Sequence, residues 1–337
     1  MKTEDPLGER GFFNNVSDHP RSCPRSLPPS DCSPNRLASG SHLRVVAVGS
    51  DERTYWVQVP PTACPDQGWP VVVMFHGGGG TARLAMNDTG WPGLADRHGF
   101  LAVFPEARRP DPSRPPGFLR NPQTWNDGSP RPALHADRRP SDDVTFFEKF
   151  MADLQADYPV DAHRIYLTGF SNGASLTFRL ARQRDASIAA IAPVAGTDWL
   201  QAPPPGPAVS VLYLTGTADP VNPLEGGPIY LGTRFFGDKP PLEEMLAPWK
   251  QRHVEAGPPR LVCQQDGCSG LRYGRPGTGT VLMVYTLEGH GHHWPGGGTV
   301  LSERFAGKNT SRLNATQLIW DFFQPRRVWH PPTAPTR

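Results

Sequence analysis

A serine flanked by glycines, in the run Gly169-Phe170-Ser171-Asn172-Gly173, is the segment whose residue types most directly indicate chemistry. It follows an apolar run at 164–168 and opens a stretch that can form a helix, the strand–turn–helix placement of a nucleophilic serine. Glycines suit this sharp turn, because they allow unusual backbone angles and close contact between helix and strand. The alternative is an ordinary turn in which Ser171 caps the helix. We favour the interpretation of Ser171 as a nucleophile.

A serine hydroxyl reacts only with a base beside it, and the base needs a carboxylate to orient it. Asp219 follows the apolar run at 209–215 within the turn-like segment TGTADP. Asp198 follows another such run and is the rival acid, but it lacks that turn context. We therefore favour Asp219.

Three histidines are candidates for the base. His290, His292 and His293 all follow the apolar run at 281–287, so each stands at the end of a predicted strand. The chain order of serine, aspartate and histidine is the order found in hydrolases built on an open parallel sheet. The residue pattern predicts acyl transfer but leaves the choice among the three histidines open.

A glycine-rich turn at 76–80, HGGGG, could stabilise the oxyanion of such a reaction. The backbone N–H groups of Gly77 and Gly78, together with that of Asn172 after the nucleophile, are the predicted donors. A phosphate-binding loop is the alternative, but the Lys-Ser/Thr of that motif is missing, and a dinucleotide fingerprint fits poorly. We interpret His76 as a structural residue of the turn.

Two tryptophans lie in segments near the predicted site, Trp125 in TWNDG and Trp294 in HHWPG. Indole rings could form the wall of a cleft for an apolar or ring-bearing acyl group. A loop tryptophan can instead be a packing plug. We assign both to the substrate cleft as a hypothesis.

Composition limits the classes of partner. The 337 residues contain 34 Lys+Arg against 32 Asp+Glu, so no basic footprint for nucleic acid stands out, and no apolar run approaches the length of a membrane span. Five cysteines show no metal-ligand spacing, so we predict no metal site. Cys263 and Cys268 either close a short disulfide loop or remain reduced thiols.

The N-terminal segment differs in composition from the rest. Residues 1–40 are rich in Pro, Ser and Arg without periodicity, which predicts a disordered tail. The first residues, MKTEDPLGERGFFNN, do not read as a signal peptide, which indicates a cytoplasmic protein or a true start elsewhere. We predict a single catalytic domain at 41–325, followed by a short tail at 326–337.

The elements that position these residues alternate along the domain. Eight β-rich runs occur at 43–48, 54–59, 71–75, 100–104, 164–168, 189–194, 209–215 and 281–287. Helices are predicted at 144–158, 172–184 and 316–323 from apolar residues at three- and four-residue spacing. The loop at 105–141 is expected to border the site. This pattern predicts an α/β domain with a mostly parallel eight-stranded sheet and helices on both faces.

Six segments in a consistent order resemble the polyhydroxybutyrate depolymerase family of esterases, which also contains feruloyl and acetylxylan esterases. They are HGGGG at 76–80, TWNDG at 124–128, DDV at 142–144, YPVDAHRIYLTGFSNG at 158–173, TGTADPVNPLEGG at 215–227 and GHGHHWPGG at 289–297. The resemblance spans roughly residues 43–324. It implies a single α/β-hydrolase domain that needs no cofactor, and relatives that are often secreted or periplasmic.

The resemblance also assigns roles. Ser171 is similar to the family's nucleophile and Asp219 to its acid, and the family's G-H-x-W-P-G run singles out His292 as the base. The implied activity is hydrolysis of short-chain hydroxyalkanoate esters or oligomers through an acyl-enzyme, because neither signal peptide nor substrate-binding domain is visible. The alternatives are a feruloyl- or acetylxylan-type esterase, an amidase, and a catalytically silent binding module.

Overall fold

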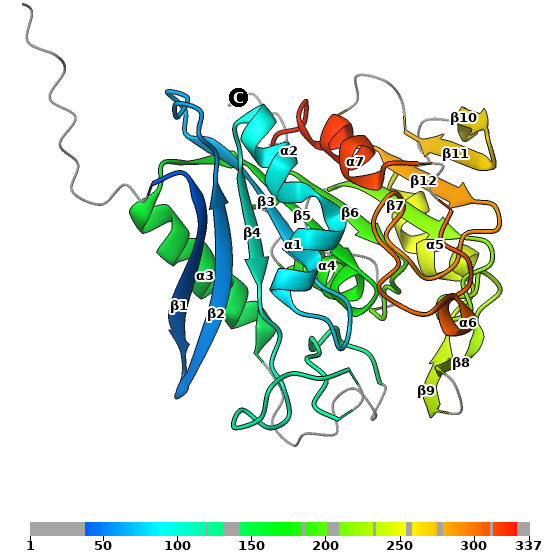
Figure 1. Ribbon diagram of the computed structural model, residues 1–337. Coiled ribbons are helices and arrows are strands. Elements are labelled where there is room, and N and C mark those ends of the chain that lie inside the picture. The colour runs from blue at the N-terminus through cyan, green and yellow to red at the C-terminus, as the bar shows by residue number, and fades with distance from the viewer. Residues whose placement is uncertain are drawn as a thin grey trace, which may run out of the picture. The chain divides into compact units, whose positions relative to one another are not determined.

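The computed structural model describes most of the chain from residue 38 onward (Figure 1). The described residues are 38–118, 120–130, 142–183, 187–200, 209–231, 234–253, 258–274, 279–310 and 313–328. Residues 1–37 of the tail expected at 1–40 and residues 329–337 of the tail expected at 326–337 lie outside this part. The division into a domain with two tails stays a prediction.

Strands and helices alternate through the described part. The strands are β1 (Gly40–Val48), β2 (Asp51–Val59), β3 (Trp69–Phe75), β4 (Leu101–Pro105), β5 (Val160–Phe170), β6 (Ala190–Val194), β7 (Ser210–Gly216), β8 (Gly227–Leu231), β9 (Arg234–Lys239), β10 (Arg260–Gln265), β11 (Cys268–Tyr273) and β12 (Leu282–Leu287). The helices are α1 (Ala82–Thr89), α2 (Trp91–His98), α3 (Asp143–Asp157), α4 (Asn172–Gln183), α5 (Leu242–His253), α6 (Glu303–Ala306) and α7 (Ala315–Phe323). No described helix is long and apolar enough to cross a membrane.

Ten strands form one twisted sheet in the order β1-β2-β4-β3-β5-β6-β7-β12-β11-β10. The six central strands from β4 to β12 run parallel, and antiparallel pairs complete both edges (Figure 1). Every residue of β3 and of β7 is buried, as expected for strands covered on both faces. The carboxyl ends of β3, β5, β7 and β12 lie at one edge of the sheet, where ligands bind in such folds.

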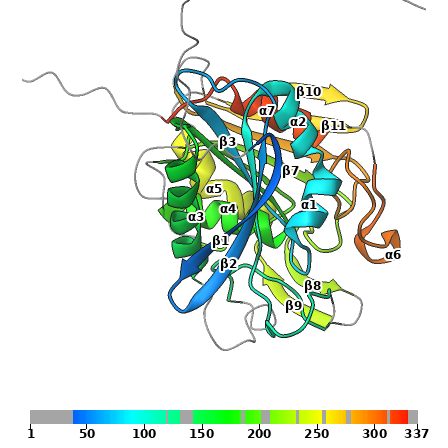
Figure 2. The ribbon, with the colours of Figure 1, turned by 60° about the vertical axis from the view of Figure 1, so that its left-hand side comes forward.

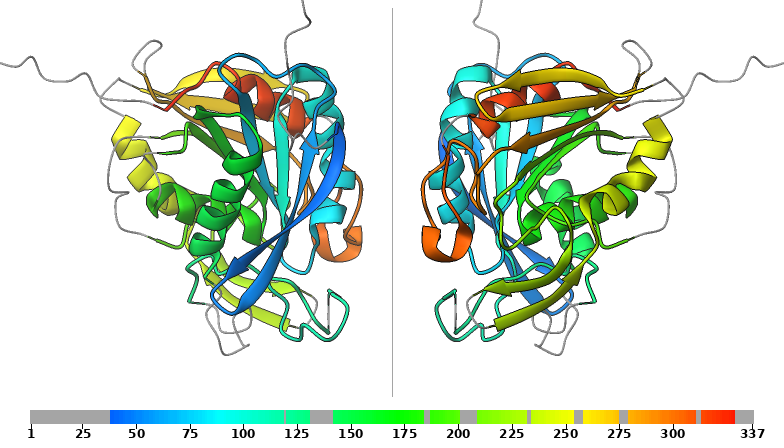
Figure 3. Two further views of the ribbon diagram at one scale, coloured as in Figure 1. Left: turned by 90° about the vertical axis from the view of Figure 1, so that its left-hand side faces the viewer. Right: turned by 90° about the vertical axis from the view of Figure 1, so that its right-hand side faces the viewer.

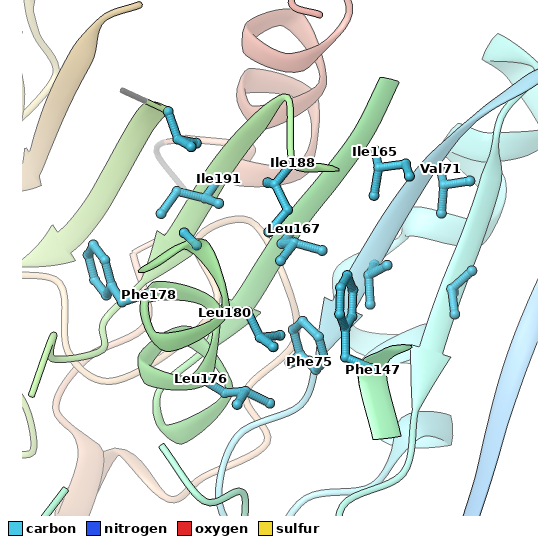
Figure 4. Packing of buried hydrophobic residues seen from close by; sticks show 14 of the residues in the cluster. Val71, Phe75, Phe147, Ile165, Leu167, Leu176, Phe178, Leu180, Ile188 and Ile191 are labelled. Carbon is cyan, nitrogen blue, oxygen red and sulfur yellow. The ribbon is translucent and has the colours of Figure 1, made fainter. Parts of the chain in front are cut away.

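Helices cover both faces of the sheet and bury two separate cores. Helices α3, α4 and α5 lie on one face, whereas α1, α2 and α7 lie on the other (Figures 2 and 3). Side chains alternate along β3 accordingly: Val71 and Phe75 join the first core and Met74 the second. Figure 4 shows Phe75 beside Leu180 of α4 within the first core.

The sequence-predicted elements are present, and the α/β class is confirmed. All eight predicted strands and all three predicted helices form, and Asp142 caps α3 by accepting a hydrogen bond from the N–H of Thr145. The sheet, however, has ten strands rather than eight. The two additional strands, β10 and β11, form an edge hairpin in which β10 is largely exposed, so apolar runs could not reveal it.

Several other elements carry weak local signals. Helix α5 contains Pro248, which normally argues against a helix interior, and α1 and α2 are only eight residues each. The β8–β9 hairpin lies outside the main sheet.

Cys263 of β10 and Cys268 of β11 are free thiols whose sulfur atoms lie 3.3 Å apart.

Candidate active site

Ser171 stands at the turn between β5 and α4, as predicted. Its backbone is left-handed, with φ 54°, which is rare for a residue with a side chain and characteristic of strained functional turns. The flanking glycines are required by close contact. A Cβ atom at Gly169 would lie 2.5 Å from the backbone of Gly173, and one at Gly173 would lie 2.3 Å from the carbonyl oxygen of Phe75. The sequence thus presents the serine at the edge of the sheet.

His292 joins Ser171 to Asp219. Its Nε2 atom lies 2.8 Å from Ser171 Oγ, and its Nδ1 atom lies 2.7 Å from Asp219 Oδ2. A carboxylate only accepts hydrogen bonds, so Nδ1 carries the proton and Nε2 is left to accept the serine proton. The other carboxylate oxygen, Oδ1, accepts the backbone N–H groups of Val221 and Asn222, which holds Asp219 in place.

The rival residues have other partners. Asp198 is buried and accepts hydrogen bonds from Arg182 and from the indole of Trp249, so it lies in a structural network on the first core. The Nδ1 atom of His290 lies 2.9 Å from Thr310 Oγ1, and His293 Nε2 lies 2.8 Å from the carbonyl oxygen of Gly307. Only His292 contacts both Ser171 and Asp219 among the three histidines.

The glycine-rich turn lies directly against the residue that follows the nucleophile. A Cβ atom at Gly78 would lie 3.5 Å from Asn172 Cβ, and Gly77, Gly78 and Asn172 all line the same cleft as Ser171. No acceptor among the described residues takes the N–H groups of these three residues, whereas Gly79 N–H donates to Gln123. Three backbone donors are therefore available for an oxyanion at this end of the cleft.

Trp125 does not line the cleft, which corrects the sequence-based hypothesis. Its side chain is fully buried, and its Nε1–H donates to the carbonyl oxygen of His76, 2.8 Å away. Its backbone N–H donates to Asn172 Oδ1 at 2.7 Å, and the Asn172 amide in turn donates to Asp127. Trp125 is a plug that holds the glycine-rich turn against the start of α4. The indole of Trp125 also packs edge to face against the ring of Phe75 in the first core.

His76 is structural, in agreement with the sequence interpretation. Its ring is buried, Nδ1 lies 2.8 Å from the carbonyl oxygen of Gly77, and Nε2 accepts the N–H of Ala107. Burial lowers the pKa of His76 to about 4, so the imidazole is neutral at physiological pH. The ring fixes the turn and carries no charge into the site.

The cleft above Ser171 has a volume of about 830 Å³. Trp294 belongs to its wall, although the indole is almost fully buried and donates to Thr316. The described part of the 105–141 loop also borders it. The cleft residues that sequence reasoning missed are mostly apolar and come from distant segments: Leu84, Phe118, Phe170, Val221, Ile229, Phe236, Val300, Leu301 and Phe305. No local pattern marks these residues, because they come from several loops and elements that are far apart in the chain.

The described residues contain no group of three or more histidine, cysteine or acidic side chains placed to hold a metal ion. The arrangement at Ser171 has instead the parts of a nucleophilic acyl transfer: an activated hydroxyl, an oriented base and backbone donors for an oxyanion.

Comparisons with known proteins agree with this chemistry. Residues 53–227, just over half of the chain, match the family described as esterase PHB depolymerase. A protein of Nocardia uniformis subsp. tsuyamanensis named as an esterase, NocK, is 27% identical over 297 residues, covering 83% of this chain and 81% of that protein. Poly(3-hydroxyalkanoate) depolymerase C of Paucimonas lemoignei is 28% identical over 127 residues, covering 38% of this chain and 28% of that protein.

A solved structure gives the fold independently. The acetyl xylan esterase from Aspergillus awamori superposes with a TM-score of 0.53 at 15% identity, covering 75% of this chain and 94% of that chain. At this identity the likeness concerns the fold alone, which is that of the α/β-hydrolases. The matched family segment contains Ser171 and Asp219, and His292 lies beyond it.

Proposed function

This chain belongs to the esterase PHB depolymerase family and is a carboxylic ester hydrolase, and from this premise we propose that it hydrolyses short-chain hydroxyalkanoate esters or oligomers through a covalent acyl-enzyme. The observation that carries the mechanism is the hydrogen-bonded series Ser171–His292–Asp219. The substrate class rests on the name of the Paucimonas lemoignei relative and on the apolar lining of the cleft.

The mechanism follows from the hydrogen bonds. Ser171 Oγ attacks the ester carbonyl while its proton passes to His292 Nε2, and the carbonyl π electrons move onto oxygen. Collapse of the tetrahedral intermediate breaks the bond to the alcohol, which leaves with the proton from His292. Water then attacks the acyl-enzyme by the same route and releases the acid. Asp219 stabilises the charged imidazolium in both halves.

Backbone amides would hold the oxyanion that develops on the carbonyl. The free N–H groups of Gly78 and Asn172 are the proposed donors, with that of Gly77 beside them. One such donor typically contributes about 2.7–4 kcal/mol to lowering the barrier. Because the donors are held by Trp125 and by the start of α4, the protein would not reorganise them during the reaction.

The first experiment measures acid release by the purified protein from soluble 3-hydroxybutyrate oligomers and, in parallel, from methyl ferulate. Faster release from the oligomers supports the proposed substrate class, and a preference for the ferulate would replace it with a feruloyl-type activity. Ser171→Ala is the control: it should abolish turnover and leave the free energy of unfolding nearly unchanged. Retained turnover in this variant would contradict the assignment of Ser171 as the nucleophile.

Labelling and histidine variants test the roles separately. A fluorophosphonate probe should react at Ser171, whereas a silent binding module would not be labelled. Single replacement of His290, His292 and His293 by alanine should give one variant as inactive as Ser171→Ala, namely that of His292. His290 and His293 variants should retain activity, because their side chains bind backbone and hydroxyl groups of the neighbouring loop.

A further inference from the structure

Asp88 is the single aspartate, glutamate, lysine or arginine among the described residues that line the cleft. It lies in the last turn of α1, its side chain is partly buried, and the triad does not use it. The neighbouring wall is mostly apolar, with Leu84 and Ala85 one turn earlier in α1 and Val300 two residues after Gly298, which contacts Asp88. A carboxylate in such surroundings attracts groups that donate a hydrogen bond and repels anions.

One oxygen of this carboxylate is used and the other is free. Asp88 Oδ1 accepts the backbone N–H of Gly298 at 2.6 Å, and no donor among the described residues contacts Oδ2. The loop that supplies Gly298 packs so closely that a Cβ atom there would lie 2.9 Å from Oδ1. Figures 2 and 3 show α1 beside this loop, which leads to α6.

The contacts of Asp88 offset only part of the cost of burying its ionised carboxylate. Burial raises the pKa of Asp88, while the hydrogen bond from Gly298 and the nearby His293 act in the opposite direction. A further donor at Oδ2 would stabilise the ionised carboxylate that the pocket now disfavours. The side chain therefore has both the position and the unused acceptor to bind a ligand group.

The position of Asp88 along α1 indicates which part of a substrate it could meet. The helix begins after its cap Thr81, which follows the oxyanion turn directly. At a rise of about 1.5 Å per residue, Asp88 lies about 10 Å along the helix from that cap. A substrate group at Asp88 would therefore be separated from the oxyanion turn by about the length of this helix segment, as the far end of an elongated substrate would be.

We propose that Asp88 determines specificity by accepting a hydrogen bond, through its free Oδ2, from a hydroxyl or ammonium group at the far end of an elongated ester, and that it disfavours esters ending in an anion. This inference rests on the proposed function, because it assumes that the ester is cleaved at Ser171. A hydroxyalkanoate oligomer has one hydroxyl and one carboxylate end, so the subsite would select the orientation in which the hydroxyl end meets Asp88.

The test compares p-nitrophenyl esters of octanoate chains that end in a hydroxyl, an ammonium or a carboxylate group. A hydrogen bond to a charged partner is worth at least about a tenfold change in binding, so the wild-type kcat/KM should favour the first two esters over the third by about tenfold. Raising the ionic strength should narrow the ratio between the ammonium and carboxylate esters. Equal kcat/KM for all three esters in the wild-type enzyme would overturn the proposal without any variant.

The variant Asp88→Asn removes the charge and keeps an oxygen for the N–H of Gly298, so it spares the loop contact. The two ratios of kcat/KM, hydroxyl to carboxylate ester and ammonium to carboxylate ester, should each fall from about tenfold to about twofold or less. The matched control is Asp66→Asn, which removes the same charge from an exposed loop at the opposite end of β3 and should leave the ratios as in the wild type. Undiminished ratios in Asp88→Asn would refute the role of Asp88.

The two proposals fail in different ways. The proposed function fails if ester cleavage persists in Ser171→Ala. The inference about Asp88 fails if the enzyme is active and depends on Ser171 but does not distinguish the three octanoate esters. If only the ratio of kcat/KM for the ammonium ester to that for the carboxylate ester falls in Asp88→Asn, the group that Asp88 binds is a cation. If the ratio for the hydroxyl ester falls as well, Asp88 also binds a neutral hydroxyl.

Discussion

Replacing Trp125 by phenylalanine tests the plug behind the oxyanion turn. The change removes one hydrogen bond, from the indole Nε1–H to the carbonyl oxygen of His76, and leaves the backbone hydrogen bond from residue 125 to Asn172. A buried carbonyl without its donor costs about 1–3 kcal/mol in the free energy of unfolding. The smaller ring adds a cavity, so the total destabilisation should lie at about 2–4 kcal/mol.

The effect on catalysis has a separate expectation. Loss of a whole oxyanion donor costs about 100- to 1000-fold in kcat. Trp125→Phe loosens the turn that carries Gly78 without deleting its N–H, so we expect kcat to fall by about tenfold. KM should stay near the wild-type value, because the lost interaction is with the transition state and not with the bound ester.

The control is another buried tryptophan with one indole hydrogen bond. Trp249 of α5 donates to Asp198, away from the cleft, so Trp249→Phe should destabilise the protein to a similar degree with unchanged kcat. Urea unfolding gives the stability, and p-nitrophenyl butyrate hydrolysis gives kcat and KM. An unchanged kcat in Trp125→Phe, or an equal loss in Trp249→Phe, would refute the reasoning.

Two further predictions concern charged groups in the interior. Burial lowers the pKa of Lys239 to about 8. Between pH 8 and the ordinary lysine pKa, the unfolded chain therefore binds a proton that the native state has lost. The free energy of unfolding, relative to that of Lys239→Met, should rise with pH over this range by up to about 3 kcal/mol. Urea unfolding of both proteins across this range measures it, and parallel curves would contradict it. Asp198→Asn removes the carboxylate charge that pairs with the buried Arg182, so it should destabilise the fold by about 3–5 kcal/mol. The variant should still hydrolyse p-nitrophenyl butyrate. Loss of kcat in folded Asp198→Asn would contradict the structural role of Asp198.

Short-range patterns account for what could be predicted. The turn around Ser171 needs a strand before it, a helix after it and glycines on both sides, and all of these are neighbours in the chain. The central strands are recognisable because they are covered on both faces and are apolar throughout. The edge hairpin β10–β11 lacks this signal, since β10 is largely exposed.

The tryptophans show where such reasoning ends. Both indoles stand near glycines in similar loop segments, yet Trp294 lines the cleft and Trp125 points into the core. The hydrogen bond that decides the orientation of Trp125 joins residues 49 positions apart in the chain. No pattern within TWNDG contains that partner, so the direction of the ring could not be predicted.

The sequence by itself determined the chemistry that is possible: a serine at a strained turn, glycines that free backbone donors, and acids and histidines at the ends of strands. The tertiary structure alone brought the favoured residues into contact, because a hydrogen bond of 2.7–2.8 Å depends on how distant strands align and not on their spacing in the chain. It placed His292 rather than His290 or His293 against Ser171, and it paired Asp198 with Arg182. It also brought Asp88 into the cleft, where Gly298 contacts one carboxylate oxygen and no donor in the described part of the chain contacts the other.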